Sequence, residues 1–256
     1  MRAVRLFDTP DQLGEAVAQD IAARMAGRDR FLLGCPGGRS PKPVYAALAR
    51  KTGLDLSRLI IVMMDDYLTT EGGALTHVDG AAHYSCRRFA RAEIQAVLNA
   101  GRRATHRIPD AQVWFPDPAD PGDYDARIQT AGGIDFFLLA SGASDGHVAF
   151  NPVGSRADSQ TRIVELTEET RRDNLMTFPD FPGLDAVPRH GVTVGIATIA
   201  AARATGMVVW GAGKRLAFRH LSAATGYDPA WPATVWAACP DATLYADRAA
   251  ATGAAR

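Results

Sequence analysis

The stretch "RFLLGCPGGRSPKPVYAALAR", residues 30–50, combines an apolar run, a glycine turn and a helical pattern. Residues 30–35 have the length and composition of a buried strand. Ser40 is placed to cap a helix, and Pro41 fits the first helical position of the segment 41–50. A strand, a glycine loop and a helix in this order form the repeating unit of proteins with a parallel sheet.

The same pattern recurs along the chain. Apolar runs of strand length occupy residues 58–64 ("RLIIVMM"), 134–140 ("IDFFLLA") and 206–210 ("GMVVW"), and polar or glycine-containing turns follow them. The alternation predicts an α/β protein with a three-layer, Rossmann-like fold, in which helices cover both faces of a mainly parallel sheet. A length of 256 residues, 47% of them hydrophobic, fits one domain that spans residues 1–256.

The two ends of the chain and one long loop complete this outline. Thr9 is a predicted N-cap for a helix that starts at Pro10 and runs to about Arg28, with Gln12 in the capping-box position. The proline-rich segment 177–191 predicts a loop long enough to cover a site. The last eight residues, "AAATGAAR", are expected to fray.

The charge balance and the cysteine content exclude several classes of binding partner and of structural site. The 28 basic residues balance 28 acidic residues, so no overall field favours nucleic acid or an anionic membrane. Three widely spaced cysteines without a CxxC pair argue against a disulfide framework and a structural zinc site, and favour a reducing cytoplasm. The N-terminus has no continuous apolar stretch for a signal peptide or a membrane span. The expected partner is a small molecule.

Ligands of open α/β sheets bind beyond the carboxyl ends of the strands, which directs attention to the turns. A glycine loop at a helix start suits a phosphate group, and a cationic side chain after a second glycine turn strengthens that hypothesis. A tight turn and an ordinary surface lysine are the plainer alternatives. Neither a Walker pattern nor GxGxxG is present, so no nucleotide cofactor is predicted. The predicted phosphate-binding residues are Gly37, Gly38, Arg39, Ser40 and Lys214.

Two acidic positions and one histidine are candidates for proton transfer. Asp65 and Asp66 end an apolar strand, where partial burial can raise a carboxyl pKa into the range of a working base. One of the two is expected to face the crevice and the other to serve structure, for example in a turn. Asp145 can orient His147, which otherwise would satisfy loop carbonyls.

Further residues around these positions are predicted to line the substrate site. They are Asp66, Gly142, Gly146 and Asn151, and His83 is a weaker candidate. The glycines would let the backbone approach a ligand closely. The histidines of the chain have no metal-ligand spacing, so no metal is predicted.

Six motifs in order resemble one family, which contains glucosamine-6-phosphate deaminase and 6-phosphogluconolactonase. They span about residues 30–247 and read "PGGRSP", "VMMDDYL", "SDGHVAFN", "VTVGIATIAAAR", "GAGKRLAF" and "WPATVWAACPDATLYAD". "DGH" followed by "AFN" is similar to the deaminase and isomerase branch, whereas lactonases usually continue differently. The "GGRSP" loop is at least as close to lactonase loops.

The resemblance implies a role for each matching residue. Asp65 matches the aspartate that moves a proton between C1 and C2 of the opened sugar. His147 matches the histidine that helps open the ring, and Asp145 matches the aspartate that orients it. The positions that match phosphate-holding loops are Gly38, Arg39, Ser40 and Lys214.

Three departures from the family pattern weaken the expectation of deamination. Pro152 stands where a relay glutamate would be, Met176 replaces a phosphate-binding arginine, and Cys239 replaces a histidine. Arg39 is the expected replacement cation, ahead of Arg171 or Arg172. A lost proton-transfer partner commonly costs about 10²- to 10⁴-fold in rate, and aldose–ketose isomerisation tolerates that loss better.

The leading hypothesis is a cytoplasmic enzyme, without a cofactor, that deaminates or isomerises an amino-sugar 6-phosphate through proton transfer between C1 and C2. The alternatives are a lactone hydrolase in which His147 activates water, and a catalytically weakened sugar-phosphate sensor. The sequel to "DGH" favours the first hypothesis over the second. The sequence leaves the exact sugar and the presence of a homo-oligomer open.

Overall fold

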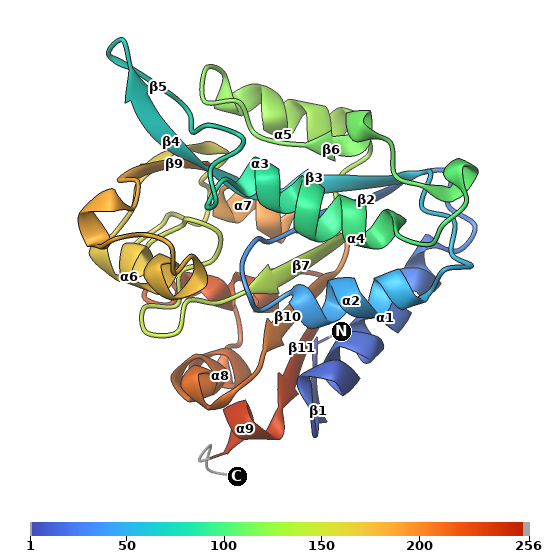
Figure 1. Ribbon diagram of the computed structural model, residues 1–256. Helices are drawn as coiled ribbons and strands as arrows, with labels where there is room; N and C mark the ends of the chain where they lie inside the picture. The colour runs from blue at the N-terminus through green and yellow to red at the C-terminus, as the bar shows by residue number, and fades with distance from the viewer. Residues whose placement is uncertain (1, 253–256) are drawn as a thin grey trace.

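The predicted strand–loop–helix units form a seven-stranded sheet in the computed structural model, which describes residues 2–252 (Figure 1). The strand order is β1-β11-β10-β7-β2-β3-β6, and every neighbouring pair is parallel. The predicted α/β fold is therefore confirmed. The strands are β1 (Arg2–Phe7), β2 (Phe31–Cys35), β3 (Leu59–Met63), β6 (Val113–Trp114), β7 (Phe136–Ala140), β10 (Thr205–Val209) and β11 (Ala242–Asp247).

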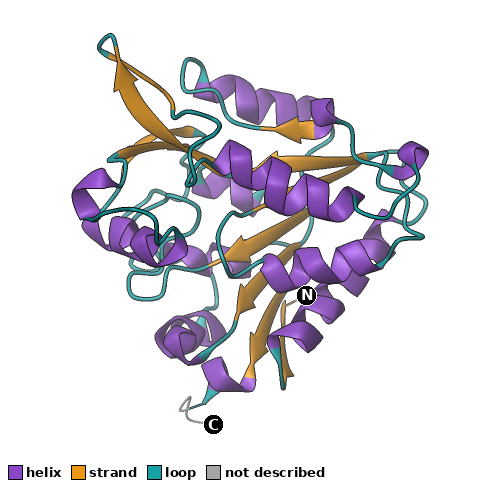
Figure 2. Ribbon diagram, in the orientation of Figure 1, coloured by secondary structure: helices purple, strands orange, loops and turns teal. Residues whose placement is uncertain are grey.

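Helices cover both faces of this sheet, as Figure 2 shows. Consecutive strand residues point to opposite faces, so Leu33 packs in one hydrophobic cluster and Leu32 in the other. One face carries α1 (Pro10–Met25), α2 (Lys42–Arg50) and a continuous helical segment made of α3 (Cys86–Phe89), a π-helical turn (Ala90–Gln95) and α4 (Ala96–Asn99). The other carries α5 (Pro121–Thr130), α7 (Ile196–Ala200), a 3₁₀ segment (Pro232–Ala238), α8 (Arg215–Ala223) and α9 (Arg248–Ala251).

The helix starts test the capping predictions. Thr9 accepts a hydrogen bond from the backbone N–H of Gln12, so the predicted cap of α1 is confirmed, although the helix ends at Met25 rather than Arg28. The prediction for Ser40 is wrong. The residue that precedes α2 is Pro41, no side chain caps this helix, and the Ser40 carbonyl accepts a hydrogen bond from Trp210 instead.

A second, antiparallel sheet was not predicted. Its order is β5-β4-β9-β8, with β4 (Asp65–Glu71), β5 (Ala74–His77), β8 (Arg162–Glu165) and β9 (His190–Thr193). β4 starts two residues after β3 ends, and its polar sequence "DDYLTTE" concealed the strand. Its first residue, Asp65, pairs with Thr193 of β9. The second sheet thus holds Asp65 at the edge of the parallel sheet.

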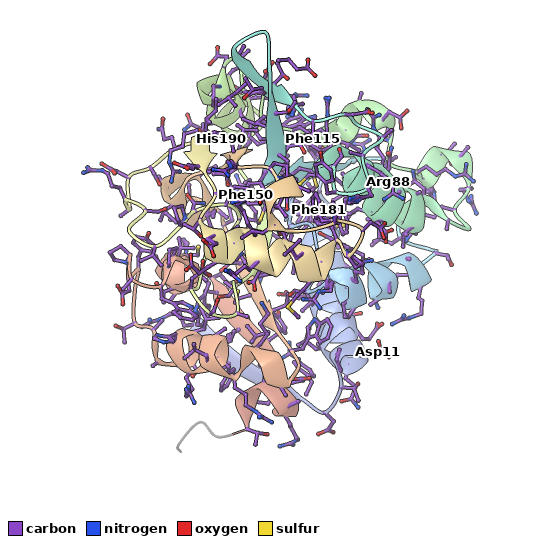
Figure 3. All side chains as sticks on the ribbon, turned by 60° about the vertical axis from the view of Figure 1, so that its left-hand side comes forward. Asp11, Arg88, Phe115, Phe150, Phe181 and His190 are labelled. Carbon is purple, nitrogen blue, oxygen red and sulfur yellow. The ribbon has the colours of Figure 1, made fainter. Side chains whose placement is uncertain are left out.

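The segment 177–191, predicted as a loop, is partly ordered into elements. α6 (Glu168–Thr177) ends in it, a 3₁₀ turn (Leu184–Ala186) interrupts it, and β9 begins at its end. Aromatic side chains of this segment pack against neighbouring elements: the Phe178 ring centroid lies 6.3 Å from that of Tyr67 in β4, and the Phe181 ring, labelled in Figure 3, lies 4.6 Å from that of Tyr84. These contacts hold the residues that follow α6 against β4 and against the segment before α3.

Two general features of the chain accompany this fold. Cys35, Cys86 and Cys239 are buried and free, in agreement with the prediction of no disulfide framework. Among the helices of residues 2–252, none combines the length and apolar character needed to cross a bilayer. Residues 253–256, part of the tail expected to fray, lie outside the described residues.

Candidate functional site

A pocket of about 360 Å³ lies beyond the carboxyl ends of the parallel strands. In the sheet, β3 and β6 lie on one side of β2, whereas β7, β10 and β11 lie on the other side. The loops that follow β2 and β7 therefore lead away from each other. Such a switch point is where ligands of open α/β sheets bind. Eight predicted site residues line the pocket: Gly37, Gly38, Arg39, Ser40, Asp65, Gly142, His147 and Lys214.

Asp65 is the buried carboxyl group of this pocket, with only 6% of its surface exposed. Its pKa is raised to about 7: burial is the largest cause and the neighbouring charge of Asp66 adds to it, whereas the Cys86 thiol and His147 lower the pKa. The Cys86 sulfur lies 3.6 Å from Asp65 Oδ1. A carboxyl group with this pKa exchanges protons near neutral pH.

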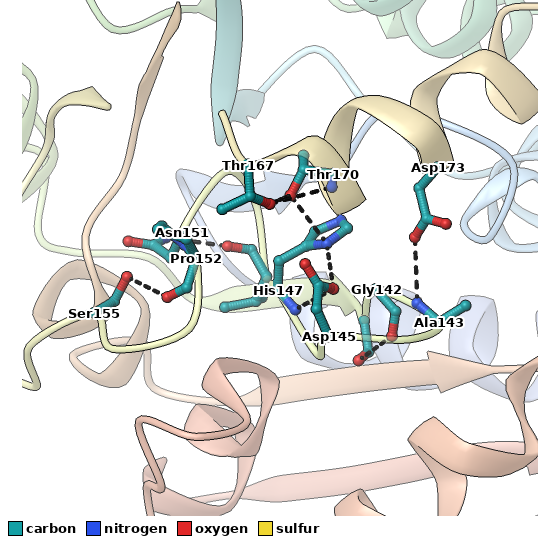
Figure 4. Close-up of polar contacts among 12 residues, drawn as sticks. Gly142, Ala143, Asp145, His147, Asn151, Pro152, Ser155, Thr167, Thr170 and Asp173 are labelled. Atoms are coloured by element: carbon teal, nitrogen blue, oxygen red, sulfur yellow. Dashed lines mark hydrogen bonds and ion pairs between the residues drawn. The ribbon is translucent and has the colours of Figure 1, made fainter. Parts of the chain in front are cut away.

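The Asp145–His147 pair occupies the loop after β7 (Figure 4). His147 Nδ1 lies 2.8 Å from Asp145 Oδ1, which also accepts a hydrogen bond from the His147 backbone N–H. Burial raises the pKa of Asp145, but its bonds to His147 outweigh that effect, and the net pKa is lowered. Asp145 is therefore an ionised partner that fixes the imidazole orientation and leaves Nε2 for other partners.

Two glycines make this loop geometry feasible. A Cβ at Gly142 would lie 2.3 Å from Asp145 Oδ1 and 2.4 Å from His147 Nδ1. Gly146 has a φ of +68°, and a Cβ there would lie 2.3 Å from the Trp231 ring. A side chain at either position would displace the pair or its support.

Three residues predicted to line the site do not line this pocket, and each has structural contacts instead. Gly146 packs under Trp231. The Asn151 side chain is fully buried and donates to the carbonyls of Val148 and Val194. His83, the weaker candidate, also lies outside the pocket walls and packs against Phe181.

Asp66 is the third of these residues, and it forms a buried hydrogen-bonding centre. It is fully buried, accepts from the backbone N–H groups of Tyr67 and Cys86, and lies 2.9 Å from His77 Nδ1. Arg87 Nε lies 3.6 Å away. One aspartate of the pair thus faces the pocket while the other organises the protein around it.

Two cationic side chains, Arg39 and Lys214, line the pocket. The Lys214 ammonium donates to the Ser141 carbonyl, and burial lowers its pKa, against the opposing charge of Asp173. Arg171 and Arg172 make contacts elsewhere, to the Leu184 and Val187 carbonyls and to Glu168. Met176 lines the pocket with 65% of its surface exposed, so no cation is present at that position.

The other two departures from the family pattern lie outside the pocket walls. Pro152 contributes a carbonyl that accepts from the Ser155 hydroxyl at 2.7 Å. Cys239 is buried, with its sulfur 3.6 Å from the carbonyl oxygens of Ile199 and Val235.

Sequence reasoning missed Asp173, which lines the pocket from α6. Nothing in "TRRDNLMTF" distinguishes it from a solvated helix residue, because its place depends on how α6 packs against the β7 loop. Asp145, His147 and Asp173 each offer one possible metal-ligand atom. These three atoms lie within 4.8 Å of one another, close enough to meet at one metal ion. Asp145 Oδ1 and His147 Nδ1 already bond to each other, so these two atoms have a partner within the protein.

Comparisons with known proteins identify a family for this chain. The family model for glucosamine-6-phosphate isomerases/6-phosphogluconolactonase matches residues 8–244. The glucosamine-6-phosphate deaminase of Bacillus velezensis is 32% identical over 95% of this chain and 96% of its own length. The protein of the same name from Rhodococcus jostii is 36% identical over 95% of this chain and 89% of its own length.

Solved structures share the fold. A monomeric glucosamine-6-phosphate deaminase superposes with a TM-score of 0.82 at 24% identity, covering 98% of this chain and 99% of that one. The 6-phosphogluconolactonase of Trypanosoma brucei has a TM-score of 0.67 at 20% identity, covering 100% and 99%. Because the family model matches most of the sequence and these relatives match nearly their full length, the chain belongs to the glucosamine-6-phosphate isomerase/6-phosphogluconolactonase family.

Proposed function

We propose that this protein is a glucosamine-6-phosphate deaminase, which converts an amino-sugar 6-phosphate and water into a ketose phosphate and ammonia. The observation that carries the proposal is the joint placement of Asp65, His147 and Lys214 in one pocket. Relatives 32–37% identical over most of the chain bear that name, which supports the deaminase over the lactonase.

His147 is proposed to assist ring opening. Its Nδ1 is held by Asp145, so Nε2 is the nitrogen that can exchange a proton with the sugar ring oxygen. Asp145 stays ionised and stabilises the imidazolium that forms when His147 takes up a proton.

Asp65 is proposed to remove the C2 proton of the opened sugar and to deliver it to C1. A base must be ionised at the working pH and must also hold the proton long enough to return it. A pKa of about 7, raised by burial, fits both requirements. The electron pair left at C2, the carbon that bears the amino group, is delocalised into the C1 carbonyl to give an enolamine. Proton delivery to C1 then gives an imine at C2, which water hydrolyses to the ketose phosphate and ammonia.

The phosphate end of the substrate is proposed to lie between the β2 loop and Lys214. Gly37 and Gly38 expose backbone there, and Arg39, Ser40 and Lys214 add side-chain donors. Binding energy from the phosphate would position C1 and C2 against Asp65. Met176 offers no cation, so fewer charges hold the phosphate than the family pattern implies.

A direct assay tests the function. Purified protein is incubated with glucosamine 6-phosphate and galactosamine 6-phosphate, and ammonia and ketose phosphate are measured, with hydrolysis of 6-phosphogluconolactone in parallel. We expect ammonia and ketose phosphate in equal amounts from one amino sugar. Lactone hydrolysis alone would assign the protein to the lactonase branch, and tight binding of all three compounds without turnover would favour a sensor.

The pH profile tests the proposed base. Only ionised Asp65 can abstract a proton, so kcat/KM should fall about tenfold for each pH unit below the Asp65 pKa and level off above it. That pKa is about 7. The Cys86 thiol lowers it, so Cys86→Ala should move the acidic limb to higher pH. Cys239→Ala, a buried cysteine outside the pocket, is the control and should leave the limb in place. A limb that Cys86→Ala does not move would belong to another group.

A further inference from the structure

The carboxylate of Asp173 occupies a position on the pocket wall that would suit a ligand anion. Asp173 Oδ2 accepts a hydrogen bond from the backbone N–H of Ala143 at 3.3 Å, across the gap between α6 and the β7 loop (Figure 4). Ala143, Asp173 and Lys214 all line the pocket. A backbone donor in a loop beyond a strand, with a cation close by, is a common way to hold an anion.

Lys214, which follows β10 in the chain, contacts the same β7 loop. Its ammonium donates to the carbonyl of Ser141, two residues before Ala143. Burial lowers the Lys214 pKa, and the largest effect that opposes burial is the negative charge of Asp173. Asp173 therefore partly neutralises the cation that a phosphate would seek.

We propose that Asp173 is a resident anion of the phosphate subsite, which competes with a ligand phosphate for the Ala143 N–H and the Lys214 charge. The proposal rests on the proposed function, because it takes a phosphate as the ligand. Asp173 thereby sets the specificity of the site: it holds down the affinity for phosphate alone, so that a ligand must make further contacts to bind.

Phosphate affinity tests this directly. Asp173→Asn keeps the shape of the side chain and removes its charge, so inorganic phosphate should bind at least about tenfold more tightly in calorimetric titration. Asp173→Glu keeps the charge and should resemble the wild type. Glu169→Gln is the matched control, because Glu169 is exposed on the same helix and lies outside the pocket. The phosphate affinity of this variant should stay within about twofold of that of the wild type.

A double-mutant cycle locates the effect. If Asp173 and phosphate compete for Lys214, the gain from Asp173→Asn should shrink severalfold in a Lys214→Met background. An undiminished gain would place the phosphate elsewhere and overturn the proposal. Unchanged or weaker phosphate binding by Asp173→Asn would overturn it as well, as would an equal gain from Glu169→Gln or no phosphate binding by any variant.

The titration separates this inference from the proposed function, because it requires no turnover. Tighter phosphate binding by Asp173→Asn in a protein that releases no ammonia would support the resident anion and reject the deaminase. Ammonia release by the wild type, with no gain in phosphate affinity in Asp173→Asn, would support the deaminase and reject the resident anion.

Discussion

Asp65→Asn is expected to lower kcat on the amino-sugar phosphate by about 10²- to 10⁴-fold or more, while substrate binding persists. The amide cannot take the C2 proton, but it has nearly the same shape as the carboxyl group and adds no buried charge. Asp65 is buried with its pKa raised, so a neutral replacement suits its surroundings. The measurement is steady-state kinetics combined with calorimetric binding of the substrate.

Glu71→Gln provides the control for this result. Glu71 is the last residue of the same strand, is exposed, and lies outside the pocket, so the same chemical change there should leave kcat unaltered. A folded Asp65→Asn variant with a kcat close to that of the wild type would remove Asp65 from the role of base. Loss of binding together with turnover would instead assign Asp65 to substrate recognition.

Asp66→Ala is expected to reduce the free energy of unfolding by about 3–5 kcal/mol. The substitution leaves the N–H groups of Tyr67 and Cys86 without their acceptor and removes the partner of His77 in a buried site. It also leaves Arg87, 3.6 Å from the carboxylate, without its ion pair. Urea denaturation followed by circular dichroism measures the change.

Glu71→Ala is the matched control, since it removes an exposed carboxylate from the same strand and should change stability by less than about 0.5 kcal/mol. If the Asp66→Ala and Glu71→Ala variants had equal free energies of unfolding, the hydrogen bonds of Asp66 would make no net contribution to stability. Activity cannot substitute for the stability measurement here, because Asp66 also raises the pKa of Asp65.

The parallel sheet could be predicted from the sequence because its strands are buried on both faces. Such strands appear as continuous apolar runs, and β2, β3, β7 and β10 all do so. The antiparallel sheet could not be predicted, because β4 continues from β3 with polar residues and pairs with β9, more than a hundred residues later. The β4–β5 hairpin does carry a local signal, the two-residue turn Gly72–Gly73 with positive φ at both glycines, but the β4–β9 pairing joins segments whose separate sequences carry no sign of it.

The candidate site likewise has one part that could be predicted from the sequence and another part that depends on the tertiary structure. Glycine turns and polar residues directly after apolar strands placed Gly38, Asp65, His147 and Lys214 at one sheet edge, because parallel strands bring their carboxyl ends together. Which of Asp65 and Asp66 faces the pocket depended on the register of β4 against β9, since adjacent strand residues point in opposite directions.

By itself the sequence determined the parallel α/β layers, the loops that carry polar groups, and the family to which the chain belongs. Only the tertiary structure decided that Asp173 reaches the pocket, that Asp66 is buried in a structural role, and that Asp65 has a raised pKa. The physical reason is that local patterns encode burial and turns, whereas desolvation and electrostatic coupling arise from groups that only folding brings together.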